Sequence, residues 1–79
     1  MSRITVDMNS AKEGDILISQ HGMRLTYVQR KNPQDAIAPY FHVVLYPNGA
    51  IGSRTDEGWV FQNRPLPEDH DIVEIIPQP

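Results

Sequence analysis

The sequence predicts an all-β protein, a small SH3-like antiparallel barrel of five to six strands with no substantial helix. Six short runs rich in β-branched and aromatic residues lie between turn residues, which is the pattern of consecutive strands. The 79 residues suffice for one domain with a thin core. Closing the sheet would remove its exposed edges. An OB-type barrel is the second choice, because it usually needs a longer chain and a helix between strands.

The expected strands follow one another closely along the chain. They cover residues 15–19, 24–30, 40–46, from 50 past 54, 59–61 and 71–76. The conformation of two turns can be predicted from their residue types. Pro47-Asn48-Gly49 predicts a type I′ hairpin, because Asn and Gly both tolerate positive φ. The stretch from Thr55 to Gly58 predicts a type I turn followed by a left-handed glycine.

The remaining segments are expected to be irregular. We treat residues 1–79 as one domain, with an N-terminal segment over 1–12 and the barrel over 13–77. Residues 6–12, with Asp7 or Asn9 as cap, are the best helical candidate but too short for a stable helix. Residues 32–39 form a mostly polar loop, and residues 63–70, with two prolines, an irregular crossing.

Composition excludes several classes of function. The net charge of −3 argues against a protein that coats nucleic acid or an anionic membrane. The absence of cysteine excludes disulfides, thiolate metal sites and thiol catalysis. The N-terminus carries no apolar targeting segment, and no run approaches the roughly 20 apolar residues of a membrane helix. We therefore expect a cytoplasmic protein without a membrane anchor.

Strand alternation predicts which side chains share a face. In residues 24–30, Leu25 and Tyr27 lie on one face. In residues 40–46, the more apolar set is Phe41, Val43 and Leu45, so we expect this set in the core. The opposite faces would then carry Arg24, Thr26, Val28 and Arg30 on one strand and Tyr40, His42, Val44 and Tyr46 on the other.

Arginines and aromatic rings on these faces suggest a recognition surface. Guanidinium groups bind phosphate or carboxylate in a bidentate manner, and aromatic rings stack on planar groups. Arg54 and Trp59 flank the second turn and offer a cation–π pair or a ligand cradle. Each feature also has a structural alternative: a solvated sheet face, a core Trp59, and an Arg54 paired with Asp56 or Glu57. The candidate ligand-binding residues are Arg24, Arg30, Tyr40, His42, Arg54 and Trp59.

Catalysis and metal binding find little support. His21, His42 and His70 have no zinc-site spacing, and consecutive residues in the 68–71 cluster point apart. Neither Ser19 nor Ser53 lies in a nucleophile motif, and no phosphate loop or dinucleotide fingerprint is present. We expect no catalytic residue, no metal and no cofactor. An enzyme would need a pocket formed between protomers, because a small barrel is filled by its own side chains.

Several short stretches carry a resemblance. They are the start at 14–16, a strand ending in Arg30, the turn at 48–49, the run 53–59 and the tail 71–75. In these stretches the chain resembles small accessory proteins of bacteriophage and prophage genomes. The resemblance implies a phage protein that acts in the host cytoplasm, one that counters a host defence system.

The predicted function is a non-catalytic binding module for an anionic, nucleotide-like small molecule. The alternative is a protein-interaction module that blocks a host or virion partner through its sheet face or its acidic tail. That tail contains Glu68, Asp69, Asp71 and Glu74, and its structural alternative is a solubilising loop. Binding of single-stranded nucleic acid is a third and weaker alternative. We also expect a homo-oligomer, since so small a domain gains core by association.

Overall fold

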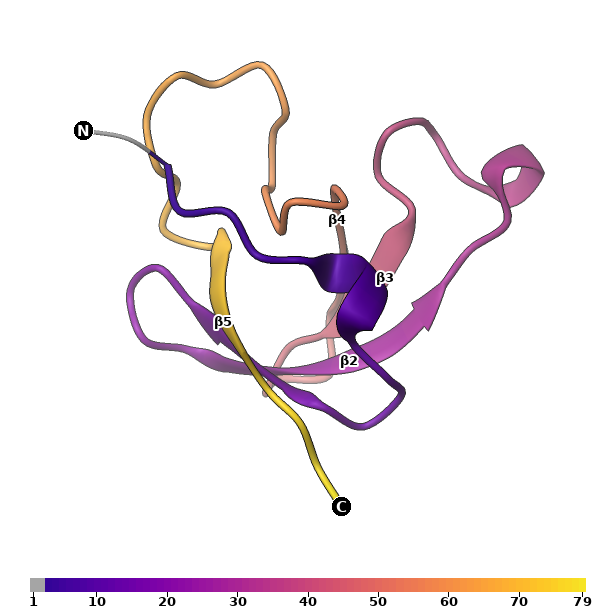
Figure 1. Ribbon diagram of the computed structural model, residues 1–79, viewed down its shortest axis with the longest axis vertical. Helices are drawn as coiled ribbons and strands as arrows, with labels where there is room; N and C mark the ends of the chain where they lie inside the picture. The colour runs from indigo at the N-terminus through magenta and orange to yellow at the C-terminus, as the bar shows by residue number, and fades with distance from the viewer. Residues whose placement is uncertain (1–2) are drawn as a thin grey trace.

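The computed structural model describes residues 3–79 and shows an all-β chain, which confirms the predicted class (Figure 1). Two three-residue 3-10 helices are the helical elements among these residues. In order, the elements are η1 (Met8–Ser10), β1 (Ile16–Ser19), β2 (Arg24–Arg30), η2 (Pro33–Asp35), β3 (His42–Leu45), β4 (Ile51–Arg54) and β5 (Ile72–Ile76). Among the described residues, no helix is long and apolar enough to cross a membrane.

One antiparallel sheet contains all five strands, in the order β4-β3-β2-β1-β5. The first four strands form a meander, and β5 returns to pair with β1 on its other side. The N-terminal segment passes across the bent sheet and carries η1, where the Asp7 side chain accepts a hydrogen bond from the Asn9 amide (Figure 1). The helical candidate at residues 6–12 thus forms a single capped 3-10 turn.

The predicted closure into a barrel is wrong. β4 and β5 are the edges of the sheet, and no pairing joins them in residues 3–79. Irregular chain occupies the opening between them. The amides of Val6 and Met8 donate to the carbonyls of Glu57 and Asp56, and Ile72 N donates to Gly58 O. These separate links take the place of a continuous ladder.

Both predicted turns form, but one has a different backbone. Among the described residues only glycines have positive φ, so Asn48 does not adopt the type I′ conformation. Instead Gly49 has φ 89° and its amide donates to Tyr46 O, while Tyr46 N donates to Ala50 O. This is the hairpin of three loop residues with a glycine bulge. The stretch from Thr55 to Gly58 follows the same pattern with φ 90° at its glycine, as predicted.

The predicted strand at residues 59–61 does not form, because side chains take its backbone hydrogen bonds. The Val60 amide donates to the Asp71 carboxylate, and the Phe61 carbonyl accepts from Arg3. The Trp59 carbonyl is occupied by Thr55 N. These bonds hold the segment without a partner strand, and five strands form instead of six.

The hydrophobic core lies on the concave face of the sheet, beneath the N-terminal segment. It consists of Met8, Leu17, Leu25, Tyr27, Val44 and Ile72. The assignment of β2 is confirmed by Leu25 and Tyr27, but that of β3 is wrong. His42 and Val44 point into the core, whereas Leu45 is exposed and Val43 packs outside this cluster. The more apolar set of β3 side chains is not the one in the core, because both ring nitrogens of His42 find hydrogen-bond partners inside the protein.

Candidate functional site

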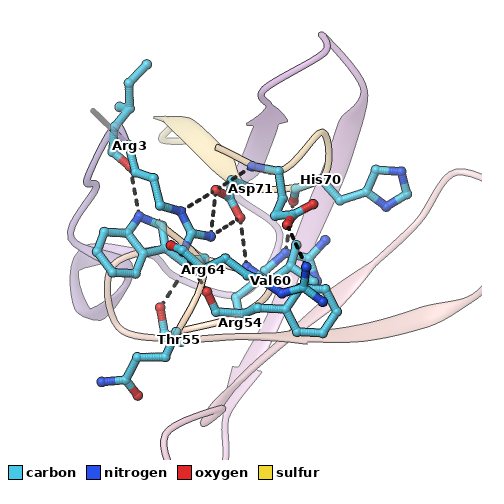
Figure 2. Close-up of polar contacts among 12 residues, drawn as sticks. Arg3, Arg54, Thr55, Val60, Arg64, His70 and Asp71 are labelled. Carbon is cyan, nitrogen blue, oxygen red and sulfur yellow. Dashed lines mark hydrogen bonds and ion pairs between the residues drawn. The ribbon is translucent and has the colours of Figure 1, made fainter. Parts of the chain in front are cut away.

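Asp71 is the centre of a buried polar network that holds the 60–71 connection in place (Figure 2). Its carboxylate is 2% exposed and receives the Arg3 guanidinium at 2.7 Å. It also accepts from the backbone amides of Val60 at 2.9 Å and Glu68 at 3.1 Å. The N-terminal segment and both ends of the 60–71 connection thus meet at one carboxylate, which makes Asp71 a structural residue.

Arg3 completes this network from the N-terminal side. Its Nη1 donates to the carbonyls of Phe61 and Arg64, and its guanidinium lies 4.4 Å from the centre of the Trp59 ring. The Trp59 indole in turn donates to Ile4 O. Trp59 is half-buried and lies outside the core cluster. Its cation–π partner is Arg3, whereas Arg54 lies over the Tyr46 ring.

Arg54 is also buried, at 1% exposure, and makes no ion pair with the neighbouring acids Asp56 and Glu57. Its three nitrogens donate to His70 O, Ser53 O and the Tyr46 hydroxyl, the last at 2.6 Å. Because Tyr46 accepts from Arg54, its own hydrogen points to Nδ1 of His70 at 3.1 Å. The guanidinium therefore ties β4 to the 60–71 connection.

His42 links the core to the 55–58 turn. Nε2 lies 2.7 Å from the Asp56 carboxylate, which can only accept, so this nitrogen carries a hydrogen. In the neutral ring Nδ1 then accepts from the Tyr27 hydroxyl, also at 2.7 Å. Burial raises the pKa of the Tyr27 hydroxyl; Arg30 opposes this shift and Asp56 adds to it. Within residues 3–79, no buried side-chain nitrogen or oxygen lacks a hydrogen-bond partner.

The six predicted ligand-binding residues are not brought together. Arg24 and Arg30 are exposed at opposite ends of β2. Arg30 bonds Asn9 and stacks on Phe41. His42 and Arg54 face inward and are fully engaged, and Trp59 holds the N-terminal segment. Tyr40 alone among the six borders an open groove.

This groove has a volume of about 560 Å³ and lies between the 31–41 loop, β4 and the 60–61 segment. Its apolar walls are Ala36, Ile37, Val60 and Phe61, and its polar lining is Lys31, Asp35, Tyr40 and Ser53. Ile37 is 83% exposed and Phe61 45%, so apolar surface remains open to solvent here. Concave sites of this size that combine apolar walls with a few polar groups are typical of ligand binding.

Hydrogen bonds within the 31–41 loop shape one wall of the groove. The loop closes at its base where Lys31 N donates to Phe41 O at 2.7 Å, and Tyr40 N donates to Ile37 O. Across the groove, the Gln62 amide donates to the Tyr40 hydroxyl at 3.1 Å. The expected polar loop therefore contains the turn η2 and is tied directly to the opposite wall.

The charged lining of the groove is one cation and one anion. Lys31 lines it, and the Arg64 guanidinium, outside the lining, lies 4.9 Å from the centre of the Phe61 ring and 4.0 Å from the Glu68 carboxylate. Asp35 is the acidic residue of the lining. An anion with a planar ring would find aromatic surface and the Lys31 ammonium group within one concavity.

The acidic tail does not form one patch. Asp71 is buried against Arg3, and Glu74 lies on the outer face of β5. Glu68 and Asp69 border a second hollow of about 460 Å³, which shares Val60 and Phe61 with the groove. Among the described residues, no cluster of three or more His, Asp or Glu side chains could hold a metal ion.

Sequence reasoning missed Arg3, Lys31 and Ile37, which together with Phe61 define the buried network and the groove. The signal for Lys31 was a cation at the end of a strand, directly before a long loop, where binding residues often lie. Arg3 gave no local signal, because its partner is 68 positions away. No protein family, curated protein or solved structure compared with this chain is significantly similar to it.

Proposed function

We propose that the protein is a non-catalytic binding module that takes an anionic, nucleotide-like small molecule into the groove. The observation that carries this proposal is the combination of the Tyr40 and Phe61 rings with Lys31 around one open concavity. A base would stack on an aromatic ring, and a phosphate would meet Lys31. The site residues thus differ from those proposed from the sequence, and Tyr40 is shared by both.

The polar residues outside the groove support binding over catalysis. His42, Arg54 and Asp71 have the chemistry of catalytic groups, but each is buried and hydrogen-bonded to several groups of the protein. A reacting atom could reach them only by displacing these partners. The resemblance to phage accessory proteins suits a sequestering role in a host cell, and this origin remains part of the proposal.

Two lysines give the proposal a matched test, since the chain contains only Lys12 and Lys31. Calorimetric titration would compare adenosine monophosphate and cyclic adenosine monophosphate with adenosine and inorganic phosphate. We expect saturable binding of a nucleotide and weaker binding of the two fragments. Lys31→Ala should weaken nucleotide binding at least about tenfold, because it removes a charge-assisted hydrogen bond. Lys12→Ala, at the turn before β1, should leave affinity unchanged.

A second substitution tests the stacking. Tyr40→Leu keeps an apolar side chain but removes the ring, and it should also weaken nucleotide binding. The proposal is wrong if no nucleotide binds saturably, or if Lys12→Ala weakens binding as much as Lys31→Ala does.

The protein-interaction alternative is favoured by a different observation. Ile37 and Phe61 expose apolar surface at the groove, which could hold an apolar side chain of a partner protein. In that case Ile37→Lys would abolish recovery of a defined partner, and nucleotides would not compete with it.

A further inference from the structure

The outer face of the sheet carries a row of four aliphatic side chains and one threonine. The strand register places Ile51 opposite Leu45, Leu45 opposite Thr26, and Thr26 opposite Ile16, and Ile16 is opposite Ile76. One row thus crosses all five strands. An antiparallel sheet with a solvated outer face normally has polar residues at such positions. Here Ile51 is 69% exposed and Leu45 36%, and the other three are half-buried.

Opposite charges flank the neighbouring row on this face. Ile18 of β1 pairs with Arg24 on one side and with Glu74 on the other. Both charged residues are exposed, and neither makes an ion pair with another residue in 3–79. Since strands are spaced about 4.8 Å apart, the two side chains start roughly 10 Å from each other, with Ile18 between them.

We infer that this face packs against the same face of a second copy of the chain, about a two-fold axis parallel to β1. Such an axis places Ile18 against its own counterpart and carries each Arg24 over the Glu74 of the other copy. The same rotation sets Thr26 over Ile76 and Ile16 over its own counterpart, whereas Leu45 and Ile51, on β3 and β4, lie beyond the edge of the partner's β5 and outside the contact. The arrangement has the apolar centre and polar rim of protein interfaces.

The size of the face sets the expected strength. The contact is confined to three short strands, β2, β1 and β5, which places it among the weak and transient interfaces that bury less than about 600 Å² per partner. We therefore expect a reversible dimer whose population rises with protein concentration. This surface is separate from the groove, so dimerisation and ligand binding can be tested independently.

Sedimentation equilibrium of the full chain, from micromolar to millimolar concentration, tests the inference. We expect a monomer of 9.0 kDa in equilibrium with a dimer of twice that mass. Arg24→Glu and Glu74→Arg should each weaken dimerisation at least about tenfold, because like charges then face each other. The double charge swap should restore it. Arg64→Glu, the same change outside this face, should have no effect.

Ile18→Lys provides a second variant, because it places two ammonium groups together on the axis. Circular dichroism would confirm that each variant is folded, and the charge variants remain decisive if Ile18→Lys fails to fold. The inference is overturned if the wild-type chain stays monomeric up to millimolar concentration. It is equally overturned if the dimer tolerates both single charge changes, or if the double swap does not restore it.

Discussion

The concave face of the sheet and the groove beside it differ in whether their side chains are occupied by contacts within the protein. On the concave face Arg54, His42 and Asp71 are buried, and each is surrounded by partners from the protein itself. At the groove, Lys31 and Ile37 are exposed and leave surface for another molecule. The residues with the most conspicuous chemistry therefore stabilise the fold, and less conspicuous ones form the opening. Burial and hydrogen bonding within the protein therefore distinguish the residues that stabilise the fold from those that form the groove, whereas residue type does not.

The largest expected effect of breaking the concave network comes from Asp71→Ala. This change leaves the Arg3 guanidinium without its anion and two backbone amides without acceptors. Breaking a buried ion pair costs about 3–5 kcal/mol, a large share of the stability of so small a domain. Urea unfolding would measure the loss. Asp69→Ala removes an exposed acid two residues away and should change stability by less than about 0.5 kcal/mol. Equal losses in both variants would contradict the structural role of Asp71.

A smaller loss is expected for Arg54→Ala, about 2–3 kcal/mol, because the Tyr46 hydroxyl and the His70 carbonyl lose a charged donor. The matched control is Arg30→Ala on β2, whose exposed contacts to Asn9 and Phe41 should contribute less than about 1 kcal/mol. The melting temperatures of the two variants would measure these losses. If Arg54→Ala has the melting temperature of the wild type, Arg54 does not stabilise the fold and is free for another role.

The smallest effects are those of pH. The pKa of Tyr27 is raised in the folded state, chiefly by burial. The folded state therefore keeps this proton more tightly than the unfolded chain, in which the pKa is about 10. The stability that Tyr27 contributes is complete below about pH 10 and is lost as the pH rises through the folded pKa. Ultraviolet titration should show Tyr27 ionising after unfolded tyrosine does, and Tyr27→Phe should remove that late step.

Asp15 provides the opposite sign at low pH. Hydrogen bonds from the backbone amides of Gln78 and Lys12 lower the pKa of this carboxyl. Its contribution is therefore present above the unfolded pKa of 3.8 and is lost as the pH falls through the lower folded value. Asp15→Asn should therefore reduce the dependence of the free energy of unfolding on pH in this acidic range. An unchanged curve would mean that the C-terminal link does not hold in solution.

The sequence revealed those parts of the fold that depend on local pattern. The Thr55–Gly58 turn and the facing of β2 follow from glycine placement and alternation, so both were predictable. The core position of His42 was not, because it depends on contacts with Tyr27 and Asp56 across two other segments. The same holds for the open sheet, since the Arg3 hydrogen bond to Phe61 O, at the place of the expected sixth strand, joins residues 58 positions apart. Of the site, Tyr40 alone was predicted.

Nuclear magnetic resonance titration of the nitrogen-15-labelled chain with cyclic adenosine monophosphate tests the central claim most directly. The account predicts saturable amide shifts confined to residues 31–40, Ser53 and the 60–61 segment, with the interior amides of His42 and Leu25 little changed. The strongest shifts around Arg24 on the outer sheet face, or no saturable shift at any amide, would contradict the assignment of the groove as the nucleotide site.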